Sequence, residues 1–263
     1  MNDPEKQTAL VTGASGGIGK EFARLLAIKG YNLILVARSK DKLLELQKTW
    51  REEFQIEVHI FPTDLANKKQ VDQLFDRINF ERLKVDILIN NAGFGDYGEF
   101  VNADAKKEDA MIRVNVNALT TLSRNMAREM VKQNHGYILN VSSVAAFQPG
   151  PLMAVYAASK AYVLSYTQAV ANELKGTGVS ATVLCPGPVD TDFVKNASLE
   201  SSRLFKIMKP VSARYVANYG LKAMFKRKVV AVPGFKEKLM AGSVRFLPSK
   251  FVTRVTRKIQ ERV

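Results

Sequence analysis

Tyr156 and Lys160 lie four residues apart in the segment VYAASKAY, with only small residues between them. A helix brings residues at this spacing to one face, so a phenol would be held beside a cation. Because a free tyrosine has a pKa of about 10, Tyr156 would be a poor base near neutral pH unless that pKa were lowered. A cation about 4 Å away would contribute roughly 4 kcal/mol, or about three pKa units. The pair could therefore transfer a proton, or it could be ordinary helix packing.

A glycine-rich turn, LVTGASGGIGK, occupies residues 10–20. Gly13, Gly17 and Gly19 would let the backbone approach a phosphate closely. The helical pattern that follows would direct unpaired N–H groups and the positive end of its dipole at the anion. The spacing differs from the G-x-G-x-x-G dinucleotide fingerprint, and an ordinary strand-to-helix turn is the alternative.

The residues after the second apolar run bear on which dinucleotide would bind. An acidic residue there would accept the ribose 2′-OH of NAD, whereas an arginine can pair with the 2′-phosphate of NADP. The sequence has Arg38 at this point, followed by Lys40 and Lys42. This favours NADP(H) over NAD(H), although a solvated loop arginine would look the same.

Short apolar, β-branched runs alternate with helical patterns, and these elements must position the groups above. The alternation predicts an α/β fold, a Rossmann-like doubly wound parallel sheet of about seven strands with helices on both faces. We expect a single domain over residues 1–263, with a substrate-loop insertion at about 190–210 and a basic tail at about 235–263. The predicted strands cover residues 8–13, 32–38, 56–62, 85–91, 136–143, 179–186 and 229–233.

Taken in order, these motifs resemble those of the short-chain dehydrogenase/reductase family, of its shorter single-domain type. The match runs from Thr8 to about Thr191. The glycine turn fits the T-G-x-x-x-G-x-G variant, NNAG (90–93) ends the fourth predicted strand, and PGPVDT (186–191) resembles the family's P-G segment. The resemblance implies an NADP(H)-dependent oxidoreductase that acts on CH–OH groups and interconverts a carbonyl compound with an alcohol.

The resemblance also implies four catalytic residues. Tyr156 would be the general acid or base, and Lys160 would lower its pKa and bind the nicotinamide ribose. Ser143 would stabilise charge on the substrate oxygen, and Asn115 would support Lys160 through a water. Ser142 competes with Ser143, but the family's serine precedes the tyrosine by thirteen residues, which selects Ser143.

The cofactor residues implied by the resemblance are spread along the first 191 residues. Asp64 would contact the adenine, while the backbone of Val189 and the hydroxyl of Thr191 would hold the nicotinamide carboxamide. The full expected set is Gly13, Ser15, Gly17, Ile18, Gly19, Arg38, Asp64, Leu65, Asn91, Ala92, Gly93, Tyr156, Lys160, Pro186, Gly187, Val189 and Thr191. No metal site is expected.

Apolar residues in the loops near the expected nicotinamide indicate an apolar or extended carbonyl substrate. The candidates are Phe94, Phe147, Met153 and Phe193. Apolar residues are more often core than pocket lining, so this remains one of two interpretations. A 3-oxoacyl thioester is one substrate hypothesis, and a steroid or small ketone is another. A catalytically silent NADP-binding regulator or scaffold is disfavoured, because such a protein has no chemical need for the whole serine, tyrosine and lysine set.

The net charge of +14 is unevenly distributed. Residues 195–263 hold 17 Lys or Arg and 3 Asp or Glu, whereas residues 1–194 hold 22 of each. A helix from about Ser249 would place four apolar residues on one stripe: Phe251, Val252, Val255 and Ile259. Such a basic helix could lie on an anionic membrane or meet an acidic acyl carrier, but packing on the domain or on a second subunit is favoured. Nucleic-acid binding is not expected, because no binding module is present.

The sequence predicts a cytoplasmic protein, with peripheral contact at a membrane surface as the alternative. Its first seven residues are polar, and no apolar run approaches the roughly eighteen residues that cross a bilayer. Cys185 is the only cysteine, which excludes an internal disulfide. The resemblance implies a homodimer or homotetramer assembled through the helices that carry Asn115 and Tyr156.

Overall fold

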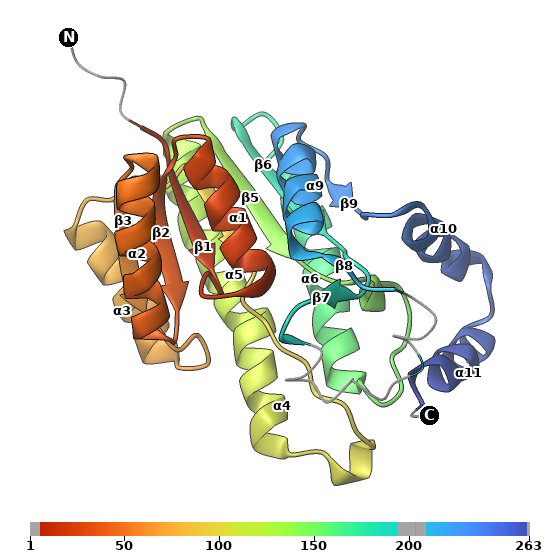
Figure 1. Ribbon diagram of the computed structural model, residues 1–263. Coiled ribbons are helices and arrows are strands. Elements are labelled where there is room, and N and C mark those ends of the chain that lie inside the picture. The colour runs from red at the N-terminus through yellow and green to blue at the C-terminus, as the bar shows by residue number, and fades with distance from the viewer. Residues whose placement is uncertain (1–5, 194–202, 204–208, 262–263) are drawn as a thin grey trace.

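A parallel sheet forms the centre of the computed structural model, which describes residues 6–193, 203 and 209–261 (Figure 1). Within these residues the strand order is β3-β2-β1-β4-β5-β6-β9. The strands are β1 (Thr8–Thr12), β2 (Asn32–Ala37), β3 (Val58–Pro62), β4 (Ile87–Asn90), β5 (Gly136–Val141), β6 (Val179–Leu184) and β9 (Val230–Ala231). All seven predicted strands are confirmed, as is the Rossmann-like fold class.

Helices cover both faces of the sheet (Figure 1). Because successive strand residues point to opposite faces, Ala9 and Val11 of β1 pack with α1 and α9, while Leu10 packs with α3 and α5. Both faces are apolar, which explains why the strands read as continuous hydrophobic runs. The helices are α1 (Gly17–Ile28), α2 (Lys40–Phe54) and α9 (Ala213–Phe225) on one face, with α3 (Lys68–Phe80), α5 (Leu119–Lys132) and α6 (Ala154–Glu173) on the other.

The strand order creates a crevice at the carboxyl edge of the sheet. The chain winds outward from β1 through β2 to β3, and then returns to place β4 on the other side of β1. Loops that leave β1 and β4 therefore diverge, and ligands of such sheets bind where they part. The glycine turn follows β1, and the NNAG segment follows β4.

Shorter elements complete the region around the crevice. The helix α4 (Ala105–Ile112) continues through a π-helical segment, η2 (Arg113–Ala118), into α5. The turns η1 (Phe100–Asn102) and η3 (Val144–Phe147) follow β4 and β5. Two further short strands, β7 (Val189–Asp190) and β8 (Val211–Ser212), pair in parallel. Most of the predicted insertion at 190–210 lies outside the described residues.

The chain ends in α10 (Phe235–Ser243), η4 (Val244–Phe246) and α11 (Ser249–Gln260), which lie together beyond β9 (Figure 1). The helix predicted from about Ser249 is thus confirmed, but its apolar stripe is not a single buried face. Val252 is buried, whereas Phe251 and Val255 are exposed, because only one side of α11 meets the rest of the protein. That residues 1–263 form a single domain stays a prediction.

Candidate active site

Hydrogen bonds of the Asn91 side-chain amide and the Thr12 hydroxyl hold the glycine turn against the end of β4. Asn91 Nδ2 donates to the carbonyl oxygens of Thr12 (3.0 Å) and Gly13 (3.4 Å). The Thr12 hydroxyl accepts from the backbone N–H groups of Asn91 and Ala92, both at 3.0 Å. Thr12 is buried and was not among the predicted site residues, although its place before the first glycine could have identified it.

Two glycines of the turn are required by space and by backbone conformation. Gly13 has φ +66°, where residues with a Cβ are strained. A Cβ on Gly19 would collide with the carbonyl oxygen of Gly13 and with Asn91 Nδ2. The absence of side chains lets Gly13 and Gly19 pack against each other at the start of α1. No side chain of these two residues then covers the N-terminus of the helix, where an anion can bind. Ser15 and Ile18 lie in the same turn.

The other predicted cofactor residues lie at the same carboxyl edge. Arg38 is exposed immediately after β2, while Asp64 and the buried Leu65 follow β3. Pro186 and Gly187 follow β6, and a Cβ on Gly17 would lie 3.2 Å from Thr191 Cγ2. The P-G segment, with buried Val189, thus reaches back to the glycine turn. The donor set of this edge fits a dinucleotide with its phosphates at α1.

Tyr156 and Lys160 are both buried on the first turns of α6. The Tyr156 hydroxyl is hydrogen-bonded to Ser143, which caps η3. Lys160 Nζ donates to the carbonyl oxygen of Val141 at 3.0 Å. Ser142 Oγ donates to the carbonyl oxygen of Lys160 at 2.7 Å, so the two adjacent serines contact different parts of α6.

Asn115 lies in the π-helical segment with its side-chain amide fully engaged. Its Nδ2 donates to the carbonyl oxygen of Phe94 and to Ser159 Oγ, both at 3.0 Å, and its Oδ1 accepts from the Phe94 backbone N–H at 3.2 Å. A Cβ on Gly93 would lie 2.9 Å from Asn115 Oδ1 and 3.1 Å from Lys160 Nζ. Asn115 and Lys160 therefore converge on Gly93, at the end of the NNAG segment.

Burial dominates the acid–base behaviour of the pair. Burial raises the pKa of Tyr156 to about 12, and the hydrogen bond from Ser143 opposes this rise. Burial also lowers the pKa of Lys160 to about 8. Lys160 Nζ donates to the carbonyl oxygen of Val141 and lies 5.8 Å from the centroid of the Tyr156 ring, and the expectation that Lys160 lowers the Tyr156 pKa stays a prediction. Tyr156, with a pKa of about 12, is a protonated phenol at neutral pH.

Removing the buried charge of Lys160 should stabilise the fold. Its folded pKa of about 8 is below the ordinary 10.5, so the unfolded chain binds more protons and stability should rise between about pH 8 and pH 10. Near neutral pH, burial of the charged Lys160 side chain costs roughly 3 kcal/mol of stability. Replacing Lys160 also removes its hydrogen bond to Val141, which is worth about 1 kcal/mol and so reduces the gain. We expect Lys160→Met to raise the free energy of unfolding in urea, with exposed Lys69→Met neutral. A large loss of stability near neutral pH would contradict this.

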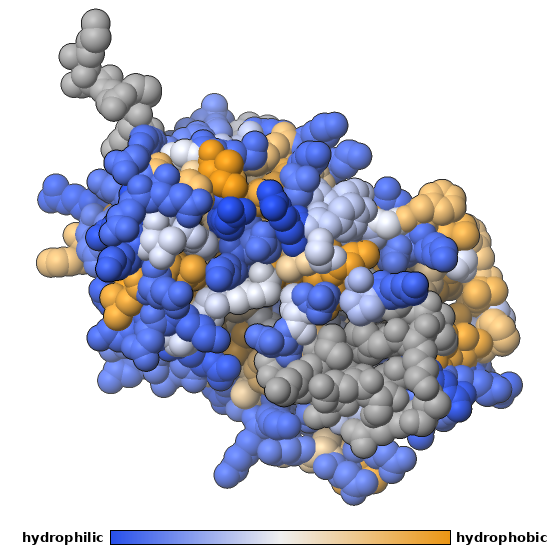
Figure 2. Space-filling model, in the orientation of Figure 1, coloured by the Kyte–Doolittle hydropathy of each residue, from blue (hydrophilic) through white to orange (hydrophobic). Residues whose placement is uncertain are grey.

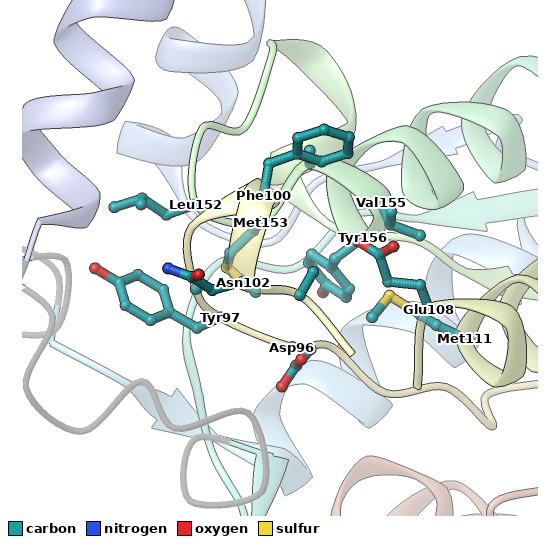
Figure 3. A pocket seen from close by; sticks show the side chains of 13 residues that line it. Asp96, Tyr97, Phe100, Asn102, Glu108, Met111, Leu152, Met153, Val155 and Tyr156 are labelled. Atoms are coloured by element: carbon teal, nitrogen blue, oxygen red, sulfur yellow. The ribbon is translucent and has the colours of Figure 1, made fainter. Parts of the chain in front are cut away.

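An apolar cluster surrounds the Tyr156 ring. Phe94, Met153 and Phe193 belong to it, and the Tyr156 and Phe193 ring centroids are 5.5 Å apart. Phe147 does not, because it packs in a different cluster, with Val163 and Leu164 of α6. A small cavity opens beside Tyr156, with Glu108 and Met111 reaching it from α4 (Figure 3). Its lining is Asp96, Tyr97, Gly98, Phe100, Asn102, Ala103, Glu108, Met111, Leu152, Met153, Ala154, Val155 and Tyr156.

Gly95 is a further residue that sequence reasoning missed. A Cβ at this position would lie 3.0 Å from Phe193 Cζ, 3.1 Å from Tyr156 Cδ2 and 3.2 Å from Met153 Cε. Gly95 thus lets the loop after β4 close over the Tyr156 ring. A glycine directly after NNAGF was the available signal.

Two classes of feature are missing from the described residues. No group of three or more His, Cys, Asp or Glu there is placed to hold a metal ion. No helix in the same part of the chain is long and apolar enough to span a bilayer.

This fold and this site define a Rossmann-like α/β oxidoreductase. The chain belongs to the short-chain dehydrogenase/reductase family: the model for short chain dehydrogenase matches residues 7–202. An uncharacterised oxidoreductase of Staphylococcus saprophyticus is 34% identical over 191 residues, which are 73% of this chain and 82% of the relative. The family resemblance noted from the motifs is confirmed.

Two of the solved structures of similar fold are complexes with a nicotinamide dinucleotide. A short-chain dehydrogenase from Sphingobium yanoikuyae in complex with NADPH has a TM-score of 0.82 at 30% identity, covering 91% of this chain and 94% of that chain. A family member from Burkholderia phymatum in complex with NAD has a TM-score of 0.81 at 26% identity, covering 100% and 99%. A 7β-hydroxysteroid dehydrogenase has a TM-score of 0.86 at 26% identity, covering 98% and 100%.

Proposed function

We propose that this protein is an NADP(H)-dependent reductase of an apolar carbonyl compound, with Tyr156 as the proton donor. The observation that carries the proposal is the buried phenol of Tyr156, which has Ser143 as its hydrogen-bonding neighbour and shares α6 with the buried Lys160. Such a group keeps its proton at neutral pH and can deliver it to an oxygen that develops negative charge. Reduction of a carbonyl is the reaction that requires this donor.

The residues divide the remaining work. A bound nicotinamide supplies the hydride. Ser143, the hydrogen-bonding neighbour of the Tyr156 hydroxyl, would hold the substrate carbonyl oxygen beside the phenol. It would also stabilise the negative charge that develops on that oxygen. Lys160, with a pKa of about 8, keeps its positive charge near neutral pH. Its Nζ and Asn115 Oδ1 both lie beside Gly93, and the proposed relay would join them through a water. The apolar cluster around Tyr156 would exclude water from the reacting atoms.

The preference for NADP(H) is proposed on the charge at the end of β2. Arg38 is exposed there, and Lys40 and Lys42 follow it at the start of α2. An arginine offers a planar fork to a phosphate, and an NADPH complex is known for the similar Sphingobium yanoikuyae protein.

We expect Arg38→Asp to lower kcat/KM for NADPH relative to NADH by about tenfold or more, since a carboxylate would repel the 2′-phosphate and accept a ribose hydroxyl. Steady-state kinetics with both cofactors give this ratio. Lys48→Asp, which makes the same charge change on the exposed side of α2, should leave it as in the wild type. An unchanged ratio in Arg38→Asp would refute the assignment.

The substrate proposed is a bulky apolar ketone, because Phe94, Met111, Met153 and Phe193 enclose the Tyr156 ring. The similarity to a 7β-hydroxysteroid dehydrogenase over 98% of this chain favours a steroid-sized compound. A 3-oxoacyl thioester is the second candidate. A screen of NADPH oxidation with steroids, 3-oxoacyl thioesters and small ketones separates them.

We also propose a homodimer or homotetramer assembled through α5 and α6. Tyr162 of α6 is 39% exposed and stacks on Tyr166, with ring centroids 5.6 Å apart. Val131 of α5 is also exposed. Light scattering of the purified protein tests this assembly.

A further inference from the structure

Large apolar side chains project from the outer side of α10, η4 and α11. Phe235 is 81% exposed and Phe246 is 88% exposed, although aromatic rings of this size are usually covered. Figure 2 shows hydrophobic residues gathered along this edge of the molecule. We call this surface the α10–α11 face; its exposed apolar residues are Phe235, Leu239, Phe246, Leu247, Phe251 and Val255.

Basic side chains stand among these apolar ones. On α11 the exposed Arg254 and Lys258 are three and seven residues after Phe251, so they share its side of the helix. Lys250 is exposed at the start of the same helix, and no acidic residue occurs from Ser249 to Gln260. On α10, Lys236 is exposed beside Phe235. The face therefore combines protruding apolar groups with positive charge.

The inner side of α11 is already held by the rest of the protein. Val252 is buried, and the Tyr97 hydroxyl donates to the carbonyl oxygen of Gln260 at 2.8 Å. Arg257 forms an ion pair with Glu99 at 3.6 Å. Because the helix is seated through its other side, the exposed groups of the α10–α11 face are presented outward.

We propose that the α10–α11 face docks on an anionic lipid bilayer. Phenylalanine and leucine side chains can enter the boundary between headgroups and acyl chains, while lysine and arginine are attracted to negative headgroups. A bilayer accepts protruding side chains without a matching groove. A second copy of this chain would instead bring two basic faces together, which like-charge repulsion disfavours.

Docking would also bring the lipid surface close to the active site. Tyr97 bonds to Gln260 and lines the cavity beside Tyr156. The loop after β4 would then lie near the lipid, where an apolar carbonyl compound is concentrated. This consequence rests on the proposed function, whereas the binding itself does not.

Vesicle co-sedimentation of the full chain tests the docking. We expect binding to phosphatidylcholine vesicles that contain phosphatidylserine, little binding to phosphatidylcholine alone, and weakening by salt. Phe235→Ser with Phe246→Ser should weaken binding about tenfold. Lys250→Glu, Arg254→Glu and Lys258→Glu together should weaken it by about a hundredfold or more.

Matched variants on the opposite edge of the sheet are the controls. Phe80→Ser removes an equally exposed ring (89%) at the end of α3. Lys48→Glu, Lys69→Glu and Lys84→Glu together reverse three exposed charges outside the face. Both controls should bind as the wild type does, and circular dichroism should show that all variants fold.

Three results would overturn the proposal. The first is no binding of the wild type to anionic vesicles at low salt. The second is equal binding by the face variants and the controls. The third is capture by polyglutamate without binding to vesicles, which would point to an acidic protein partner. NADPH oxidation measured without lipid tests the proposed carbonyl reduction separately. A negative result for vesicle binding therefore does not refute the reductase function, and the reverse also holds.

Discussion

Replacing Tyr156 by phenylalanine should reduce carbonyl turnover by about a thousandfold or more while dinucleotide binding is kept. The ring is buried in the cluster with Met111 and Met153, so phenylalanine fills the same space. Only the hydroxyl that bonds to Ser143 is lost, and with it the proposed proton donor. Single-turnover kinetics and NADPH fluorescence titration measure the two properties independently.

A second tyrosine on the same helix supplies the control. The hydroxyls of Tyr162 and Thr120 form a hydrogen bond at 2.9 Å, and Tyr162 is partly exposed. Tyr162→Phe removes the same atom from α6 outside the cluster and keeps the ring that stacks on Tyr166, so its turnover should equal that of the wild type. Substantial activity in Tyr156→Phe, or equal losses in both variants, would show that Tyr156 is not the proton donor.

The second large effect should come from Gly19→Ala. The added Cβ would collide with the carbonyl oxygen of Gly13, which is a backbone atom, and with Asn91 Nδ2, which is held by hydrogen bonds to the carbonyl oxygens of Thr12 and Gly13. The turn between β1 and α1 would have to open, which would displace the N–H groups that we propose bind the phosphates. We expect dinucleotide affinity to fall by about a hundredfold, with a lower melting temperature.

Gly16 allows a control within the same turn. Apart from its chain neighbours, nothing lies within 4 Å of a Cβ built on Gly16, and its φ of −172° is open to any residue. Gly16→Ala should therefore melt at the temperature of the wild type. Differential scanning fluorimetry compares the two variants directly, and an equal drop in both would mean that the turn tolerates no added methyl anywhere.

The fold was predictable because each strand carries its own signal. Runs such as NLILVA are apolar on both sides, as buried parallel strands require, and Gly13 and Pro186 follow the ends of β1 and β6. The catalytic segment was also predictable, since Tyr156 and Lys160 are close in sequence and share one helix. A sequence pattern is therefore sufficient to predict a site when its residues are close together in the sequence.

Contacts between distant segments could not be predicted in the same way. Met111 and Gly95 reach the Tyr156 ring only because α4 and the loop after β4 fold over it. Phe147 was expected near the substrate but packs in another cluster, with Val163 and Leu164 of α6. The rise of the Tyr156 pKa comes from burial, which sequence spacing does not report.

The central claim is tested most directly by NADPH consumption with a panel of bulky ketones, using wild type and Tyr156→Phe side by side. The account predicts that at least one ketone stimulates NADPH oxidation by the wild type. It also predicts that Tyr156→Phe binds NADPH with the same affinity and consumes none. NADPH binding by the wild type without turnover of any carbonyl compound would contradict it, and would favour a dinucleotide-binding protein without catalysis.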